Sequence, residues 1–93
     1  MTSLLPDAAV DGWLESHPDW SRDGAGINRS VQAASFLAGL DLVQRVGALA
    51  EERDHHPDID IRWRTVTFRL STHTAGGVTE LDLRLAEAID ELT

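Results

Sequence analysis

The chain has 93 residues, which leaves room for one hydrophobic core, so we expect a single domain over residues 1–93. Its formal charge is −8, and all eight basic residues are arginines scattered along the sequence. Without a basic stripe to neutralise phosphates, direct nucleic-acid binding is not expected. No apolar stretch approaches the ~20 residues that cross a bilayer, so we expect no membrane segment.

Composition also restricts the chemistry. The sequence contains no cysteine, lysine or tyrosine, which excludes a thiolate, a Schiff-base amine and a phenol and leaves histidine, carboxylates and hydroxyls. The first residues lack a basic segment followed by an apolar run, so we expect no secretory signal and a cytoplasmic location. Because a domain this small buries only ~60 to 65% of its unfolded surface, self-association is expected to help it.

The first half of the chain predicts a helix, a turn and a strand. Pro6 suits a first helical position, and a partial apolar stripe predicts a helix over residues 6–15. Residues 22–26 are typical of a turn, and an imperfect alternation predicts a strand over residues 27–34. Together these elements lead directly into the strongest helix of the sequence.

That helix follows Ser35, a favourable N-cap, with apolar residues recurring at spacings of three and four through Ala50. Pro57 disfavours helical geometry at His56. The helix is therefore expected to end with residues 51–55 as its last turn.

A change of parity marks the next segment. Ile59, Ile61 and Trp63 occupy odd positions, whereas the apolar residues from Val66 to Leu70 occupy even ones. A one-residue slip would move every side chain to the other face of the sheet. We therefore expect a bulge, or a break between two strands, near residue 64.

The last segment predicts a turn at residues 75–77 and then a helix to the end of the chain. Thr79 followed three residues later by Asp82 fits a capping box. The resulting order of helix, strand, helix, one or two strands and helix favours an α+β fold, an antiparallel sheet covered on one side by helices.

Chemistry is most plausible around two adjacent histidines. His55 and His56 fall at a helix C-terminus, with Glu51 four residues before His55 on the same helical face. The negative end of the helix dipole and the carboxylate both favour imidazolium, so a proton donor is available. His73 follows a strand, where a loop can present a side chain to a cleft.

Structural roles would also explain these residues. Histidines near a helix C-terminus often act as stabilising caps, capping alone accounts for Asp82, and a loop histidine such as His73 is often a surface residue. The histidines and carboxylates could bind a metal, but their spacing lacks H-E-x-x-H, and we expect none. Neighbours in a strand point to opposite faces, which works against a nucleophile at Thr72 or Ser71 activated by His73.

The spacing of these residues closely resembles the signature of the pterin-4a-carbinolamine dehydratases. Glu51-x3-His55-His56-Pro57 is followed after five residues by Trp63, after nine more by His73 and after eight more by Asp82. The flanking segments 45–51, 70–73 and 76–79 also look like the family. The resemblance is strong from about residue 27 to residue 90.

This resemblance implies an α+β fold, a four-stranded antiparallel sheet carrying three helices on one face, in chains that assemble as homodimers or homotetramers. The family sheet has one strand that the sequence pattern does not predict, and this strand would then lie near residues 19–22. Val31 and Ala33 stand where the family often has phenylalanine, and Ile59 where many members have tryptophan. We expect these three at packing or cleft-wall positions.

The implied activity is a lyase reaction, the dehydration of 4a-hydroxytetrahydrobiopterin or a related pterin to the quinonoid dihydropterin in tetrahydropterin recycling, with no metal or cofactor. Histidines can deliver and accept the required protons near neutral pH. Which histidine is the acid and which the base stays open. The resemblance implies that His55 and His73 are the acid-base pair and that His56 is a positioning or assisting group. It implies that Glu51 and Asp82 are the carboxylates that orient these histidines. Pro57 and Trp63 are carried over as two further substrate-site residues.

Two other functions are compatible with the same signature. The resembled family includes proteins that stabilise transcription-factor dimers or assist the assembly of other enzymes, so a non-catalytic interaction protein is one. A dehydratase for another pterin, such as a folate or molybdopterin precursor, is the other. A pterin-dependent hydroxylase would be a natural partner of the catalytic form.

Overall fold

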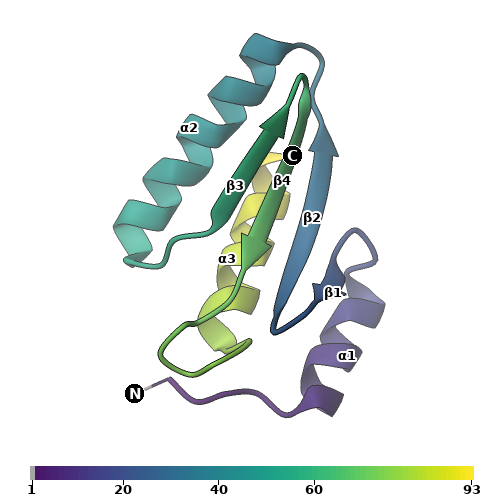
Figure 1. The fold of residues 1–93 in the computed structure, drawn as a ribbon, viewed down its shortest axis with the longest axis vertical. Helices are drawn as coiled ribbons and strands as arrows, with labels where there is room; N and C mark the ends of the chain where they lie inside the picture. Colours follow the sequence, from purple (N-terminus) through teal and green to yellow (C-terminus); the bar gives the residue numbers. More distant parts are fainter. Residues whose placement is uncertain (1) are drawn as a thin grey trace.

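The computed structural model describes residues 2–93. Its four-stranded antiparallel sheet carries three helices on one face, as the resemblance implied (Figure 1). No helix within residues 2–93 is both long and apolar enough to cross a membrane. In chain order the elements are α1 Asp7–Ser16, β1 Ser21–Asp23, β2 Gly26–Gln32, α2 Phe36–Arg53, β3 Asp58–Arg62, β4 Thr65–Leu70 and α3 Glu80–Leu92.

The sheet has the strand order β1-β2-β4-β3, with every neighbouring pair antiparallel. Val66 of β4 lies opposite Val31 of β2 and Ile61 of β3, so one apolar row faces the helices. The short β1 is the strand that the resemblance placed near residues 19–22. The strand predicted over 27–34 begins one residue earlier and ends at Gln32.

The opposite face of the sheet is polar. Arg69 of β4 donates to Asp23 of β1, which also accepts from the Asn28 side chain at 3.1 Å. The hydrogen bond from Arg69 lowers the pKa of Asp23 below its ordinary value of 3.8. The same pairing raises the pKa of the Arg69 guanidinium. On this face Ser30 and Thr67 also share a hydrogen bond of 2.8 Å.

The predicted change of parity is a break between two strands. Trp63 and Arg64 form the turn between β3 and β4, and Trp63 has a φ of +52°, in the left-handed region. Ile59 pairs with Phe68 and Ile61 with Val66 across this hairpin. Odd positions on β3 and even positions on β4 therefore face the same side of the sheet.

Helix α2 begins as predicted and ends earlier. The Ser35 hydroxyl accepts from the Ala38 N–H at 3.0 Å, which confirms the N-cap. At the other end Arg53 is the last helical residue, and Asp54 adopts the left-handed conformation with φ 50°. The N–H of His55 then donates to the Ala50 carbonyl at 3.1 Å, as in a Schellman motif. The prediction that residues 51–55 form the last turn is therefore wrong, and both histidines lie beyond the helix.

Helix α3 begins at the predicted capping box. Thr79 is the N-cap, and the Asp82 side chain accepts from the Thr79 N–H. Its apolar stripe, including Leu85 and Ile89, fills the core beneath β2 and β4. The N-terminus of α3 and the C-terminus of α2 lie toward the same end of the molecule (Figure 1). This arrangement brings His55, just beyond the end of α2, to Asp82 in the first turn of α3.

Candidate functional site

Asp82 is fully buried, and its two carboxylate oxygens have different partners. Oδ2 accepts from the Thr79 N–H and from the Thr72 hydroxyl, each at 2.8 Å. Oδ1 lies 2.5 Å from Nε2 of His55. Asp82 therefore caps α3 with one oxygen and fixes a histidine with the other, so the structural and the functional interpretation of this residue both apply.

Thr72 belongs to a chain of hydroxyl groups behind this carboxylate. Its Oγ1 is 2.7 Å from that of Thr79, whose hydroxyl also accepts from the Leu81 N–H at 3.2 Å. Since Thr72 donates to Asp82, the Thr79 hydroxyl donates to Thr72. Sequence reasoning considered Thr72 only as a nucleophile and missed this role, although its even position continues the inward parity of Val66, Phe68 and Leu70.

His55 is held in one orientation. Its backbone is tied to Ala50 by the turn that ends α2, and its side chain is largely buried. Because the carboxylate of Asp82 can only accept, the neutral imidazole carries its proton on Nε2. Nδ1 is then left as the acceptor, the arrangement by which a carboxylate fixes a histidine tautomer.

His56 pairs with Glu51 at 2.5 Å between Nε2 and Oε2, and both side chains are exposed. The sequence placed Glu51 on the same helical face as His55, on the assumption that the helix continued through both residues. That placement is wrong, because α2 ends at Arg53 and the left-handed turn at Asp54 directs His55 toward Asp82. His56 consequently takes the place beside Glu51.

His73 lies in the turn between β4 and α3. The Thr72 N–H donates to the Gly77 carbonyl at 2.8 Å, and the Gly76 N–H donates to the His73 carbonyl at 3.2 Å. Gly76 has a φ of +78°, which only glycine adopts without strain. This closed turn holds the exposed His73 side chain beside the other two histidines.

All three histidines line one pocket of about 470 Å³. This volume falls in the range of small-molecule sites, about 300 to 1,000 Å³. No three His, Asp or Glu side chains within residues 2–93 are grouped to hold a metal ion. The lining residues are Asp54, His55, His56, Pro57, Asp58, Ser71, Thr72, His73, Thr74 and Leu81.

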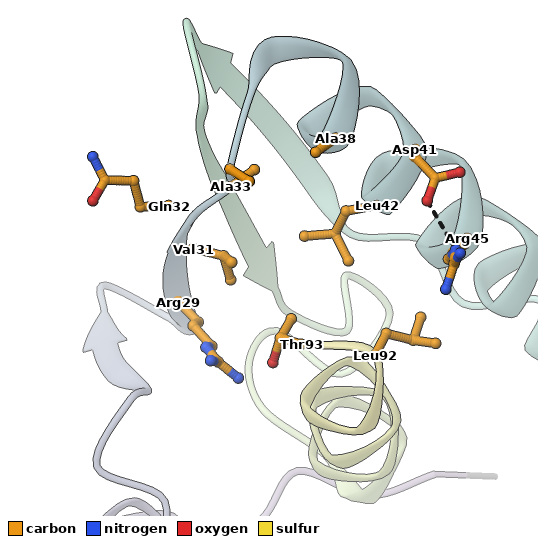
Figure 2. A pocket seen from close by; sticks show the side chains of 11 residues that line it. Arg29, Val31, Gln32, Ala33, Ala38, Asp41, Leu42, Arg45, Leu92 and Thr93 are labelled. Carbon is orange, nitrogen blue, oxygen red and sulfur yellow. Dashed lines mark ion pairs between the residues drawn. The ribbon is translucent and has the colours of Figure 1, made fainter.

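A second hollow, of about 410 Å³, lies between β2, the first half of α2 and the end of α3 (Figure 2). Its lining includes an ion pair of Asp41 with Arg45 at 3.0 Å but no histidine. Val31 and Ala33, which stand where the resembled family often has phenylalanine, face this hollow. Those departures therefore do not alter the lining of the histidine pocket.

Trp63 is the predicted site residue that the structure keeps apart from the histidines. Strand β3 starts beside the pocket at Asp58, and Trp63 follows the far end of the strand, about 16 Å away at ~3.3 Å per residue. There the Trp63 ring is exposed and contacts the Arg64 guanidinium, 4.9 Å from the ring centre. Pro57, by contrast, lies in the pocket wall.

Comparison with known proteins identifies the family of the chain. The family model described as pterin 4 alpha carbinolamine dehydratase matches residues 3–92. The chain belongs to this dehydratase family. A family member from Nocardia farcinica is 58% identical over 91 residues, which cover 98% of this chain and 96% of the relative. Another, from Mycolicibacterium smegmatis, is 52% identical over 90 residues, covering 97% and 96%. Both carry the provisional name pterin-4-alpha-carbinolamine dehydratase.

The dehydratase fold is also seen in a solved structure. A crystal structure named as a transcriptional coactivator/pterin dehydratase from Brucella melitensis matches with a TM-score of 0.89 and 27% identity. The match covers 95% of this chain and 96% of that one. The fold and the family predicted from the sequence are thus confirmed.

Proposed function

We propose that this protein dehydrates a 4a-hydroxytetrahydropterin, such as 4a-hydroxytetrahydrobiopterin, to the quinonoid dihydropterin, and so serves tetrahydropterin recycling. The observation that carries the proposal is one pocket lined by three histidines, in which a buried carboxylate fixes His55. Such a constellation suits the two proton transfers that this reaction requires.

In this reaction the C4a–O bond breaks, and the hydroxyl leaves as water after receiving a proton. N5 loses its proton, and the electron pair of the N–H bond forms the C4a=N5 double bond. In the proposed site His55 and His73 exchange these two protons with the substrate. Asp82 keeps Nδ1 of His55 as the acceptor in the neutral ring, while His56 with Glu51 and Pro57 position the pterin.

The test is the dehydration rate with the carbinolamine generated in place by a pterin-dependent hydroxylase. Wild type should accelerate the reaction, and His73→Ala should lose about 10²- to 10⁴-fold, the usual value of one positioned acid or base. His17→Ala is the matched control, because His17 stacks on Trp13 at 3.9 Å and is not among the lining residues of the pocket. Equal rates for wild type and the uncatalysed reaction would refute the proposal.

A second proposal concerns assembly. Three large apolar side chains on α2, those of Phe36, Leu37 and Leu40, are exposed. In a 93-residue domain, such a surface favours contact with another chain. We propose a homodimer or homotetramer, checked by mass in solution; a 10.2 kDa species at micromolar concentration would contradict it.

The same exposed residues favour one alternative function, an interaction protein of this fold. The Brucella melitensis structure carries both names, coactivator and dehydratase. Pull-down of a hydroxylase or another partner, abolished by Leu37→Asp and unaffected by His73→Ala, would support the interaction role. Dehydration that persists in Leu37→Asp would show that catalysis does not need that surface.

A further inference from the structure

We propose that the histidine pocket selects pterins with an uncharged side chain and rejects those that carry phosphate or glutamate groups, and that Asp54 and Asp58 set this selectivity. The inference rests on the proposed function, because it takes the same pocket as the pterin site. The sequence left open whether the substrate is a biopterin or another pterin, such as a folate or molybdopterin precursor, and the inference favours the pterin with the uncharged side chain.

The charge of the pocket wall is the first observation. Of its ten described lining residues, two are aspartates and none is an arginine. Buried Asp82 adds a third carboxylate behind the wall, and exposed Glu51 lies against His56. Since His55 and His56 each pair with one of these carboxylates, their protonation would not leave the pocket positive. His73 is the one lining imidazole that lacks such a pairing in the described structure.

Arg69, the cross-strand neighbour of Asp58, makes its hydrogen bond to another carboxylate. Asp58 begins β3 opposite Arg69 of β4. The Arg69 guanidinium donates to Asp23, on the polar face of the sheet. An anionic substrate would therefore meet carboxylates without a dedicated cation, whereas sites for phosphate or carboxylate groups use arginine or backbone N–H donors.

Asp54 supplies an independent observation, because its charge is unfavourable for the fold. Its φ of 50° is the left-handed conformation, which glycine or asparagine adopts readily at this position of a helix end. A carboxylate there also lies at the negative end of the α2 dipole. Asparagine would serve the turn without that repulsion, so the fold does not require the negative charge that Asp54 places at the pocket wall.

Binding, rather than turnover, provides the test. Fluorescence titration would compare 7,8-dihydroneopterin with its monophosphate, two ligands with the same ring. At low ionic strength wild type should bind the neutral ligand about tenfold more tightly, and the ratio should shrink to a few-fold at 0.15 M salt as charges are screened. The double variant Asp54→Asn with Asp58→Asn should remove most of this preference.

Asp60→Asn is the matched control, because Asp60 lies on the same edge strand, pairs with Arg62 at 3.2 Å and does not line the pocket. It removes one negative charge, as each of the two substitutions in the double variant does singly, and should keep the preference. Asp54→Asn should also retain or raise the melting temperature. Equal binding of both ligands by wild type, no binding of either, or a preference that survives the double variant would overturn the inference. Selective binding without dehydration would refute only the proposed function.

Discussion

Two histidine-carboxylate pairs with the same separation lie in opposite environments. His55 and Asp82 are 2.5 Å apart, as are His56 and Glu51. The side chains of the first pair are 11% and 0% exposed, whereas those of the second are 54% and 79% exposed. Distance alone therefore says little about what each pair contributes.

The difference lies in what surrounds each carboxylate. Asp82 has no access to water, so each of its hydrogen bonds replaces hydration that folding removed. Glu51 keeps its hydration, and an exposed ion pair is worth only ~0 to 1 kcal/mol. We therefore expect the first pair to govern stability and geometry, and the second to affect substrate contacts alone.

The largest effect should come from Asp82→Ala. This change leaves His55, Thr72 and the N–H of Thr79 without their acceptor inside the core, and should cost about 3 kcal/mol of unfolding free energy. Urea denaturation measures it. The exposed counterpart, Glu51→Ala, should cost less than about 0.5 kcal/mol. Equal losses in the two variants would show that burial does not separate the pairs.

Replacing the histidine of each pair by glutamine should show the same difference in stability between the buried and the exposed pair. His55→Gln should lower the unfolding free energy by about 1 to 2 kcal/mol, because a buried carboxylate loses a well-placed donor. His56→Gln should change it by less than about 0.5 kcal/mol. Thermal and urea unfolding check both values. A larger loss for His56→Gln would reverse the assignment of the structural pair.

Thr72→Val removes one donor to Asp82 while preserving side-chain shape. A loss of about 1 kcal/mol is expected, together with a lower dehydration rate, because Asp82 would hold His55 less firmly. Thr67→Val is the matched control, since its hydroxyl makes a 2.8 Å bond to Ser30 at the exposed face. If both variants lose equal stability and neither affects the rate, Thr72 does not position the site.

The smallest effect concerns the pair of Asp23 with Arg69 on the polar face. The pKa of Asp23 is lower in the folded protein than its ordinary 3.8, because Arg69 donates to the ionised form. Its contribution to stability is therefore present above about pH 4 and is lost as the pH falls through the folded pKa. Between pH 6 and pH 3 the free energy of unfolding should fall less steeply in Asp23→Asn than in wild type. An identical slope would indicate that the pair contributes nothing.

Local patterns were sufficient for most of the fold. The N-cap at Ser35, the capping box of Thr79 with Asp82 and the change of parity before Val66 each depend on neighbouring residues, and each is confirmed. The short β1 carries too few residues to establish an alternation, so only the family resemblance placed it. The end of α2 was wrong by two residues, because a left-handed aspartate at position 54 leaves little trace in sequence.

The sequence by itself determined the element types, the family and the residues able to transfer protons, because periodicity, caps and residue chemistry act over a few positions. Only the tertiary structure decided the partners: Asp82 with His55, Glu51 with His56, and Trp63 apart from both pairs. These partners depend on the direction in which the chain leaves α2 and on the packing of α3 beneath β4. Both are properties of contacts between segments far apart in the chain, which local spacing does not encode.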